Sequence, residues 1–314
     1  MTARSSTTFG NTTRTRCLRE VAIFKDFTRR RIDADGIGID LVTAGSGPPL
    51  LLLHGYPQTH VIWHKVAPIL AEHFTVVAPD LRGYGDSDTP PGGENAAAYA
   101  KRVMAADQVA VMAALGHDRF HLAGHDRGGR VSYRLALDYP ERVIRLAVLD
   151  IIPTLEQFER MGTSGSHGSF HWYFLSQPAP FPETLIGADP AYFLRHMVEN
   201  WCGTPGAITD EAMAAYIEAF KNPEVIRATC DDYRAGIGID CDIDRADRTA
   251  GKRIDGPMLA LWGARGRPHK AEGVMSVWRE WATDLRGQGI DCGHFLPEEA
   301  PRETAAALLS FFTE

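Results

Sequence analysis

The feature that most constrains this chain is the run Gly-His-Asp-Arg-Gly-Gly-Arg at residues 124 to 130. Residues 119–123 before it have the pattern of a buried strand, and residues 131–137 after it have the pattern of a helix. Glycines at this spacing between a strand and a helix are typical of a sharp turn that presents a nucleophile above a sheet. Asp126 occupies the nucleophile position. A carboxylate there can attack a carbon atom and form an ester.

Strand and helix patterns alternate along much of the chain from about residue 37. Helical patterns cover residues 63–72 and 99–115. The expected strands are residues 37–43, 49–54, 74–79, 119–123, 146–150 and 257–263. This alternation predicts an α/β fold with a mostly parallel sheet and helices on both faces.

The alternation stops after Pro153, and residues 156–245 are helical in pattern, aromatic-rich and interrupted by Pro and Gly. We expect this insertion to form a helical cap over the carboxyl ends of the strands, where open α/β sheets bind their ligands. The predicted division is a disordered N-terminal tail at 1–30, a first core part at 31–155, the cap at 156–245 and a second core part at 246–314.

Charge and composition exclude several classes of function. The net charge of −7 gives no reason to expect nucleic acid or an anionic membrane as a partner. No apolar run approaches the ~20 residues of a membrane span, and the first 30 residues lack the apolar region of a secretory signal. The five cysteines are scattered without a C-x-x-C pair, which suits a reducing compartment and argues against a zinc site. We therefore expect a cytoplasmic location and no metal.

An ester on Asp126 needs a base for its hydrolysis, and His294 is the candidate by position. It lies in Cys-Gly-His-Phe-Leu-Pro at residues 292–297, just before the last helical pattern at 298–312. A histidine there can take a proton from water. The alternative is an ordinary histidine of a surface loop, since the chain has 12 histidines.

The carboxylate that orients this histidine is expected to be Asp150. It lies at the end of the strand at 146–150, the next strand after the helix that follows the nucleophile. The turn after Trp262, where many hydrolases carry the acid, has none in this chain. Asp138 and Asp291 are the weaker alternatives.

Arg127 and Arg130 follow the nucleophile directly. Two guanidinium groups beside an anionic nucleophile suit a small anionic substrate whose carboxylate they can bind through paired hydrogen bonds. Because the chain as a whole is negative, this attraction has to be local. The alternative is that an arginine, Arg130 more readily than Arg127, pairs with a structural acid.

The run His-Gly-Tyr-Pro at residues 54–57 directly follows an apolar strand. Such a turn, which contains Tyr56, can aim a backbone N–H into the site. The N–H of Arg127 can supply a second donor for the oxyanion that forms when water attacks the ester.

Several motifs together resemble the α/β-hydrolase superfamily, and within it most closely the haloacetate dehalogenases. They are HGYP at 54–57, DLRGYGDSD at 80–88, GHDRGGR at 124–130 and GHF at 293–295. The resemblance runs from about residue 33 to the C-terminus. Epoxide hydrolases and haloalkane dehalogenases share HGxP and GHDxG, but haloalkane dehalogenases typically carry Trp where this chain has Arg127.

This resemblance implies that the chain converts a 2-haloacetate to glycolate and halide, with fluoroacetate as the expected substrate and chloroacetate as the alternative. In the family a His-Trp pair and a Tyr of the cap hold the halide, and the matching residues are His171, Trp172 and Tyr233. Trp201 matches a further cap tryptophan that lines the pocket. The family uses no cofactor and is commonly dimeric, so a homodimer is expected. On the residues alone, Trp172 and Tyr233 would be expected to pack in the cap core.

Two other functions fit parts of the sequence. An epoxide hydrolase would use the same aspartate and histidine with two cap tyrosines, Tyr233 and one of Tyr173, Tyr192 or Tyr216. The arginine pair and the missing acid of the late strand count against it. A non-catalytic receptor of this fold is the other alternative, and the presence of all three catalytic candidates counts against it.

Overall fold

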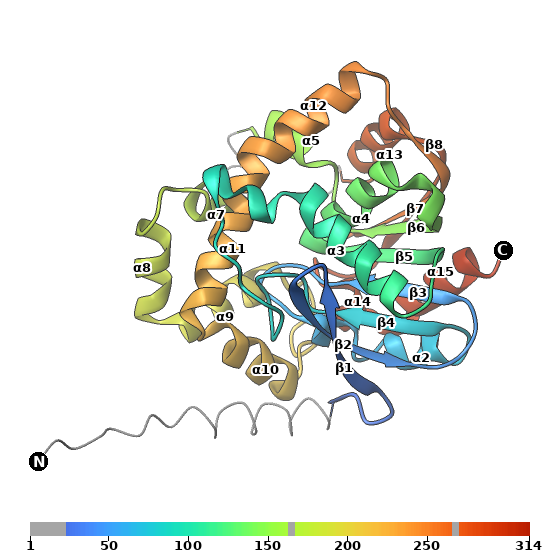
Figure 1. The fold of residues 1–314 in the computed structure, drawn as a ribbon, viewed down its shortest axis with the longest axis horizontal. Coiled ribbons are helices and arrows are strands. Elements are labelled where there is room, and N and C mark those ends of the chain that lie inside the picture. The colour runs from blue at the N-terminus through green and yellow to red at the C-terminus, as the bar shows by residue number, and fades with distance from the viewer. Residues whose placement is uncertain (1–22, 163–166, 266–269) are drawn as a thin grey trace, which may run out of the picture.

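The computed structural model describes residues 23–162, 167–265 and 270–314, and a sheet of eight strands forms the centre of this part (Figure 1). The strand order is β1-β2-β4-β3-β5-β6-β7-β8. β2 pairs antiparallel with β1 and β4, and the remaining pairs are parallel. The strands are β1 (Thr28–Ala34), β2 (Ile37–Ala44), β3 (Pro49–Leu53), β4 (Thr75–Pro79), β5 (Phe120–His125), β6 (Val143–Leu149), β7 (Ile254–Gly263) and β8 (Ala282–Ile290). The predicted mostly parallel α/β fold is confirmed.

The middle strands carry the apolar runs that the sequence predicted as strands. β5 lies between β3 and β6 and is buried at every position, and β3 is buried from Leu50 to Leu53. Strands of a parallel sheet are covered on both faces, so they read as continuous apolar runs. The carboxyl ends of these strands therefore determine where the turns that follow them place their side chains.

Helices flank the sheet in pairs. α3 and α4 pack against each other and lie in front of the strands in Figure 1, and α2 and α15 form a second packed pair. The bounds are α2 (Ala67–Ala71), α3 (Lys101–Ala114), α4 (Asp126–Asp138), α13 (Lys270–Trp281), α14 (Leu296–Glu299) and α15 (Pro301–Phe312). Short helical turns occur at η1 (His60–Trp63), η2 (Glu94–Tyr99) and η3 (Pro140–Arg142).

A long helical segment connects β6 to β7, and its helices gather at the left and top of Figure 1. It consists of α5 (Thr154–Glu159), α7 (Phe170–Leu175), α8 (Phe181–Ala188), α9 (Pro190–Trp201), α10 (Asp210–Phe220), α11 (Pro223–Ala235), η4 (Gly236–Asp240) and α12 (Cys241–Thr249). The helices extend slightly beyond the predicted range of 156–245 at both ends. We call this segment the cap.

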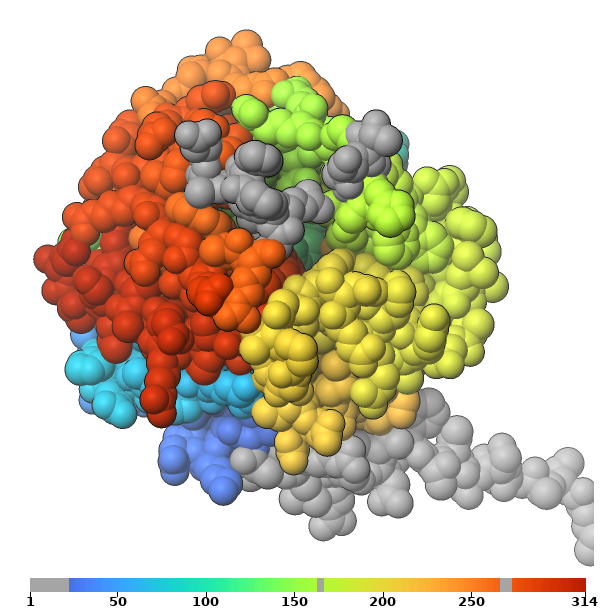
Figure 2. Space-filling model, turned by 180° about the vertical axis from the view of Figure 1, so that it is seen from behind, coloured from blue at the N-terminus to red at the C-terminus, as the bar shows by residue number. Residues whose placement is uncertain are grey.

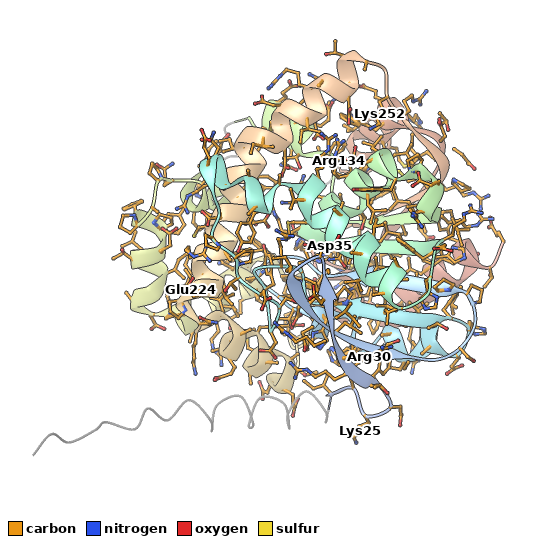
Figure 3. All side chains as sticks on the ribbon, viewed as in Figure 1. Lys25, Arg30, Asp35, Arg134, Glu224 and Lys252 are labelled. Atoms are coloured by element: carbon orange, nitrogen blue, oxygen red, sulfur yellow. The ribbon has the colours of Figure 1, made fainter. Side chains whose placement is uncertain are left out.

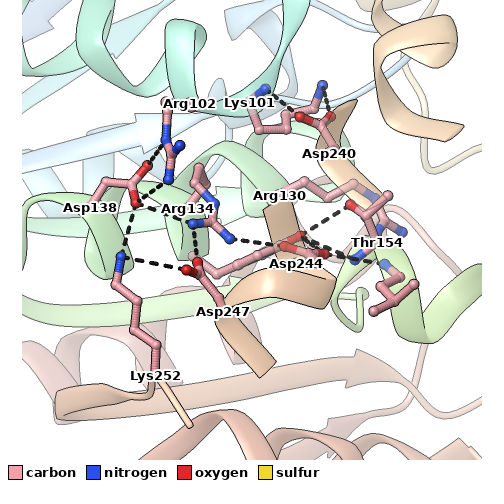
Figure 4. A network of polar contacts seen from close by, with 12 residues as sticks. Lys101, Arg102, Arg130, Arg134, Asp138, Thr154, Asp240, Asp244, Asp247 and Lys252 are labelled. Carbon is pink, nitrogen blue, oxygen red and sulfur yellow. Dashed lines mark hydrogen bonds and ion pairs between the residues drawn. The ribbon is translucent and has the colours of Figure 1, made fainter. Parts of the chain in front are cut away.

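Buried ion pairs join the cap to the sheet helices. Lys25 lies at the lower edge of the molecule in Figure 3, whereas Arg134 is buried. Arg134 of α4 binds Asp244 of α12 at 2.9 Å, and Asp247 also contacts it (Figure 4). Burial makes such pairs costly to break, so they hold α12 in a fixed place above α4.

The structure corrects the predicted tail. Residues 1–22 lie outside the described residues, but Thr28, Arg29 and Arg30 belong to β1, where Thr28 pairs with Thr43. The prediction that the tail extends to residue 30 was therefore wrong. β1 is an edge strand with mostly exposed polar residues, and such strands lack the apolar run that marks a buried strand.

Two other elements differ from the prediction. The expected helix at 63–72 is interrupted: η1 ends at Trp63, and α2 begins at Ala67, next to Pro68 in its first turn. Proline favours a helix start at that place, because its missing N–H needs no partner there. The edge strand β8 was not predicted, since only its two end residues are buried.

No helix within the described ranges is both long enough and apolar enough to cross a membrane.

Candidate active site

Asp126 stands at the sharp turn between β5 and α4. It is the first residue of α4 and has a φ of +47°, in the left-handed region that side chains other than glycine rarely adopt. Gly128 faces the end of β3 so closely that a Cβ would lie 2.3 Å from the carbonyl oxygen of His54. The glycine spacing of the motif is thus required by the close approach of α4 to β3, and the predicted turn is present.

His294, Asp150 and Asp126 come together at the carboxyl ends of the strands. Nδ1 of His294 lies 2.6 Å from Oδ2 of Asp150, and Nε2 lies 3.8 Å from Oδ2 of Asp126. Oδ1 of Asp150 accepts the N–H of Gly263 at 2.9 Å. The end of β7 therefore contributes a backbone donor that holds the acid, instead of the acid itself.

The alternative acids lie elsewhere. Asp138 accepts hydrogen bonds from Arg102 and Lys252 (Figure 4). Asp291 is exposed and pairs with Arg265. Of the three acids that the sequence left open, the structure brings only Asp150 to His294.

The carboxyl group of Asp126 is surrounded by groups that favour its charged form. Burial opposes ionisation, but His294, Arg130 and Arg127 outweigh it and hold the pKa of Asp126 below its ordinary value. The N–H of Tyr56 donates to Oδ1 at 2.9 Å. Asp126 is therefore an ionised carboxylate with one oxygen held by the predicted turn.

Arg127 is completely buried, and its main partner is Asp232 of α11. Nε and Nη2 donate to the two carboxylate oxygens of Asp232 at 2.8 Å each. The possibility that an arginine pairs with a structural acid thus applies to Arg127 and not to Arg130, contrary to the order expected from the sequence. Asp232 was missed, although it directly precedes the predicted halide residue Tyr233.

Asp232 lies within a larger network of buried charges. Tyr84 donates its hydroxyl to Oδ2 at 2.7 Å, and Nζ of Lys101 contacts Oδ1. The backbone N–H of Lys101 donates to Asp240 at 2.8 Å. Although burial opposes ionisation of Asp232, Arg127 and Lys101 hold its pKa well below the ordinary value.

Arg130 has partners of a different kind. Nη1 donates to the carbonyl oxygen of Ile152 at 2.9 Å and to the hydroxyl of Thr154 at 3.3 Å. Figure 4 shows Arg130 beside Thr154, and its guanidinium carbon lies 4.4 Å from the ring centre of Trp172. Among the described residues, Arg130 forms no ion pair within 4 Å. Its charge is therefore available to an anion.

The three residues matched to a halide site lie together. The ring centre of Tyr233 is 5.7 Å from that of His171 and 5.4 Å from that of Trp172. Burial lowers the pKa of His171 to about 3 and raises that of the Tyr233 phenol well above its ordinary value. Both side chains are therefore neutral near pH 7, with an N–H or O–H that can be donated.

Buried polar atoms without a partner converge around Asp126. Buried polar groups in proteins are nearly always hydrogen-bonded, and isolated exceptions often mark functional sites. Within the described ranges, the site atoms that find no protein partner include Arg127 Nη1, Arg130 Nε, His171 Nδ1, Tyr56 Oη and Tyr233 Oη. Most of these are donors, so the arrangement suits a small anion with several acceptor atoms.

Trp201, the residue matched to a pocket tryptophan of the cap, lies beside two histidines of the site. Its ring centre is 4.5 Å from that of His171 and 5.6 Å from that of His294. The ring of His125, which the sequence reasoning did not single out, is tilted by 52° against that of His294, with the ring centres 4.6 Å apart. Its position directly before the nucleophile was the only signal in the sequence.

Of the cap tyrosines proposed for an epoxide hydrolase, Tyr233 lies beside Asp126, but its three possible partners do not. Tyr173 and Tyr192 are exposed, and Tyr216 donates its hydroxyl to Glu298 at 3.0 Å. Tyr56 is instead the phenol next to Tyr233, with ring centres 5.3 Å apart. In the part of the chain that the structure describes, no group of three or more His, Cys, Asp or Glu side chains could hold a metal.

Comparison with known proteins agrees with the fold. A family model for the alpha/beta hydrolase fold matches residues 48–301. A fluoroacetate dehalogenase from Burkholderia sp. is 43% identical over 93% of this chain and 96% of its own length. A soluble epoxide hydrolase from Corynebacterium sp. (strain C12) is 34% identical over 91% of this chain and 98% of its own. A solved structure from Nostoc sp. PCC 7120, described as an α/β-hydrolase, has a TM-score of 0.90 and 51% identity, and covers 93% of this chain and 99% of that chain.

Proposed function

The chain belongs to the α/β-hydrolase family, and from that premise we propose that it hydrolyses a 2-haloacetate to glycolate and halide. Fluoroacetate is the proposed substrate. The observation that carries the proposal is the set of unpartnered buried donors, with two arginines among them, around an ionised aspartate. The similarity to a fluoroacetate dehalogenase supports it.

The substrate carboxylate binds between the two arginines. Asp232 occupies Nε and Nη2 of Arg127, so this residue offers Nη1, while Arg130 offers Nε. Each guanidinium thus contributes one nitrogen to one carboxylate oxygen, and both arginines bind the carboxylate as the sequence suggested. Charge-assisted hydrogen bonds in a buried site are strong, and they orient the α-carbon toward Asp126.

In the first step Asp126 displaces the halide. Oδ2 attacks the α-carbon, the carbon–halogen bond breaks with its electron pair on the halide, and an ester of Asp126 forms. The departing ion gains negative charge in a dry pocket, where donors stabilise it far more than they would in water. His171, Trp172 and Tyr233 are the donors proposed for this role.

In the second step water hydrolyses the ester. Nε2 of His294 takes a proton from water, and the hydroxide attacks the carbonyl carbon of Asp126. Asp150 holds Nδ1–H and stabilises the imidazolium. The oxyanion develops on Oδ1, next to the N–H of Tyr56. The N–H of Arg127, in the first turn of α4 where amides lack a helical partner, is the proposed second donor. Its collapse breaks the bond between the carbonyl carbon of Asp126 and Oδ2, and glycolate leaves with Oδ2 and with the proton that His294 returns.

Epoxide hydrolysis is the second candidate. The free hydroxyls of Tyr56 and Tyr233 are neighbouring O–H donors that could protonate an epoxide oxygen. The epoxide hydrolase relative shares less of the sequence, at 34% identity against 43%. An epoxide also has no carboxylate for Arg130 to bind.

Halide release separates these functions. Purified protein is incubated in parallel with fluoroacetate, chloroacetate, 2-chloroacetamide and styrene oxide, with Asp126→Asn as the inactive variant and the exposed Asp118→Asn as its matched control. The proposal expects fluoride and chloride from the two acids, little from the uncharged amide, and neither from Asp126→Asn. Chloride without fluoride would restrict the substrate to chloroacetate. Diol from styrene oxide without halide from either acid would overturn the proposal in favour of the epoxide reaction.

A further inference from the structure

The backbone N–H groups of residues 293–295 and the carbonyl of His294 all have hydrogen-bond partners. The N–H of His294 donates to the carbonyl oxygen of Trp201 at 3.0 Å, and the carbonyl of His294 lies 2.8 Å from Nε2 of His125. The N–H groups of Gly293 and Phe295, on either side, donate to the Glu299 carboxylate at 2.8 and 2.9 Å. The loop that carries the histidine is therefore held on each side, and Glu299 makes two of the contacts.

The same carboxylate reaches the cap. Oε2 of Glu299 accepts the N–H of Gly203 at 2.9 Å in addition to that of Gly293. The two glycine backbones touch, because a Cβ on Gly293 would lie 2.2 Å from the nitrogen of Gly203. Figure 2 shows the yellow segment near residue 200 directly against the orange to red C-terminal part. Glu299 thus fastens the end of α9, with Trp201, to the loop of His294.

These three hydrogen bonds need a carboxylate. An ionised carboxylate accepts several N–H groups strongly, and both oxygens of Glu299 are engaged. A glutamine has the same shape but one oxygen. In either orientation of its amide, an NH2 group faces at least one backbone N–H, so that donor loses its partner and is repelled.

We propose that Glu299 is a positioning residue for ester hydrolysis: it fixes the loop of His294 against Trp201 so that Nε2 stays beside the Asp126 carbonyl. This inference rests on the proposed function. Asp126 is held by the β5–α4 turn and by Tyr56, not by Glu299. Loss of Glu299 therefore slows the second step, in which His294 acts, and leaves the first step nearly unchanged.

The test is Glu299→Gln, with Glu303→Gln as a matched control on an exposed position of α15. Each protein is mixed with fluoroacetate, and the reaction is quenched during turnover. Intact-mass spectrometry then gives the fraction of the protein that carries the ester. A misplacement of the base by a fraction of an ångström to one ångström costs on the order of 10- to 100-fold in rate. We expect kcat to fall by that factor in Glu299→Gln while the ester accumulates and the rate of the first halide release is retained. Glu303→Gln should behave as the wild type.

A fall in turnover without ester, or unchanged turnover, would overturn the inference. If Glu299→Gln does not fold, Glu299→Asp keeps the charge with a shorter reach, and the same accumulation of ester is expected from it. His294→Asn distinguishes a failure of this inference from a failure of the proposed function. Ester in His294→Asn but not in the Glu299 variants would remove this inference alone, whereas no ester in His294→Asn would remove the proposed function.

Discussion

Asp232 binds Arg127 with both carboxylate oxygens, at 2.8 Å to Nε and 2.8 Å to Nη2. The pair fixes the plane of the guanidinium and leaves Nη1 as the nitrogen without a protein partner among the described residues. The ring of Tyr233 covers the guanidinium at 4.2 Å. The direction in which Arg127 can bind an anion is therefore set by Asp232.

Asp232→Asn should weaken substrate binding. The amide keeps one acceptor, so Arg127 loses a charge-assisted bond worth about 1.5–3 kcal/mol and the orientation of Nη1 relaxes. We expect KM for the haloacetate to rise by roughly 10- to 100-fold, with a smaller change in kcat, when halide release is followed over a range of concentrations. Asp231→Asn is the control, because that neighbour pairs with Arg227 and Arg234 instead. An unchanged KM would show that Arg127 does not bind the carboxylate.

The two arginines should differ in what they contribute to stability. Arg127→Met breaks a buried pair with Asp232 and should lower the free energy of unfolding by about 3 kcal/mol. Arg130→Met breaks no ion pair among the described residues, and burial together with Arg127 already lowers the pKa of Arg130, so its removal should cost less stability than that of Arg127. Urea unfolding of both variants gives the comparison. Equal losses would contradict the different partners described for the two residues.

Tyr233→Phe should discriminate between halides. The hydroxyl is buried without a protein partner among the described residues and is the proposed donor to the departing ion. Loss of one such donor costs on the order of 100-fold. Fluoride is a smaller ion than chloride, so its charge is more concentrated and depends more on a hydrogen-bond donor. We therefore expect the rate with fluoroacetate to fall further than the rate with chloroacetate. Equal falls with both substrates would indicate a packing role for Tyr233.

Glu298 should make stability depend on pH. Burial raises its pKa from 4.5 to about 8, while Tyr216 and Gln58 donate to it. Between these values the folded protein keeps a proton that the unfolded chain has lost. This contribution is complete below pH 4.5 and declines as the pH rises to about 8, by up to about 1.4 kcal/mol per pH unit. The difference in unfolding free energy between the wild type and Glu298→Gln should show this slope, and a pH-independent difference would contradict it.

The sequence predicts the residues that local motifs place at strand ends. Asp126 follows β5 and Asp150 follows β6, and parallel neighbouring strands bring such positions to one edge of the sheet. His294 was identified by its place before the last helices. The structure brings these three residues together. The apolar middle strands could be predicted because they are buried on both faces of the sheet.

The partners of these residues could not be predicted in the same way. Asp232 lies 105 residues from Arg127, and Gly203 lies 96 residues from Glu299. No periodicity in one sequence links such distant positions, because the contacts arise only when the cap folds onto the sheet. The edge strands β1 and β8 were missed or cut short for a simpler reason, since exposed polar strands carry no apolar run.

The central claim is that Asp126 forms an ester that His294 hydrolyses. The most direct test is the intact mass of His294→Asn after incubation with fluoroacetate. The account predicts that the protein gains the mass of one carboxymethyl group, located on the peptide that contains Asp126, with one fluoride released per chain. The double variant Asp126→Asn/His294→Asn should stay unmodified. An unchanged mass of His294→Asn, or a label on another residue, would contradict the account.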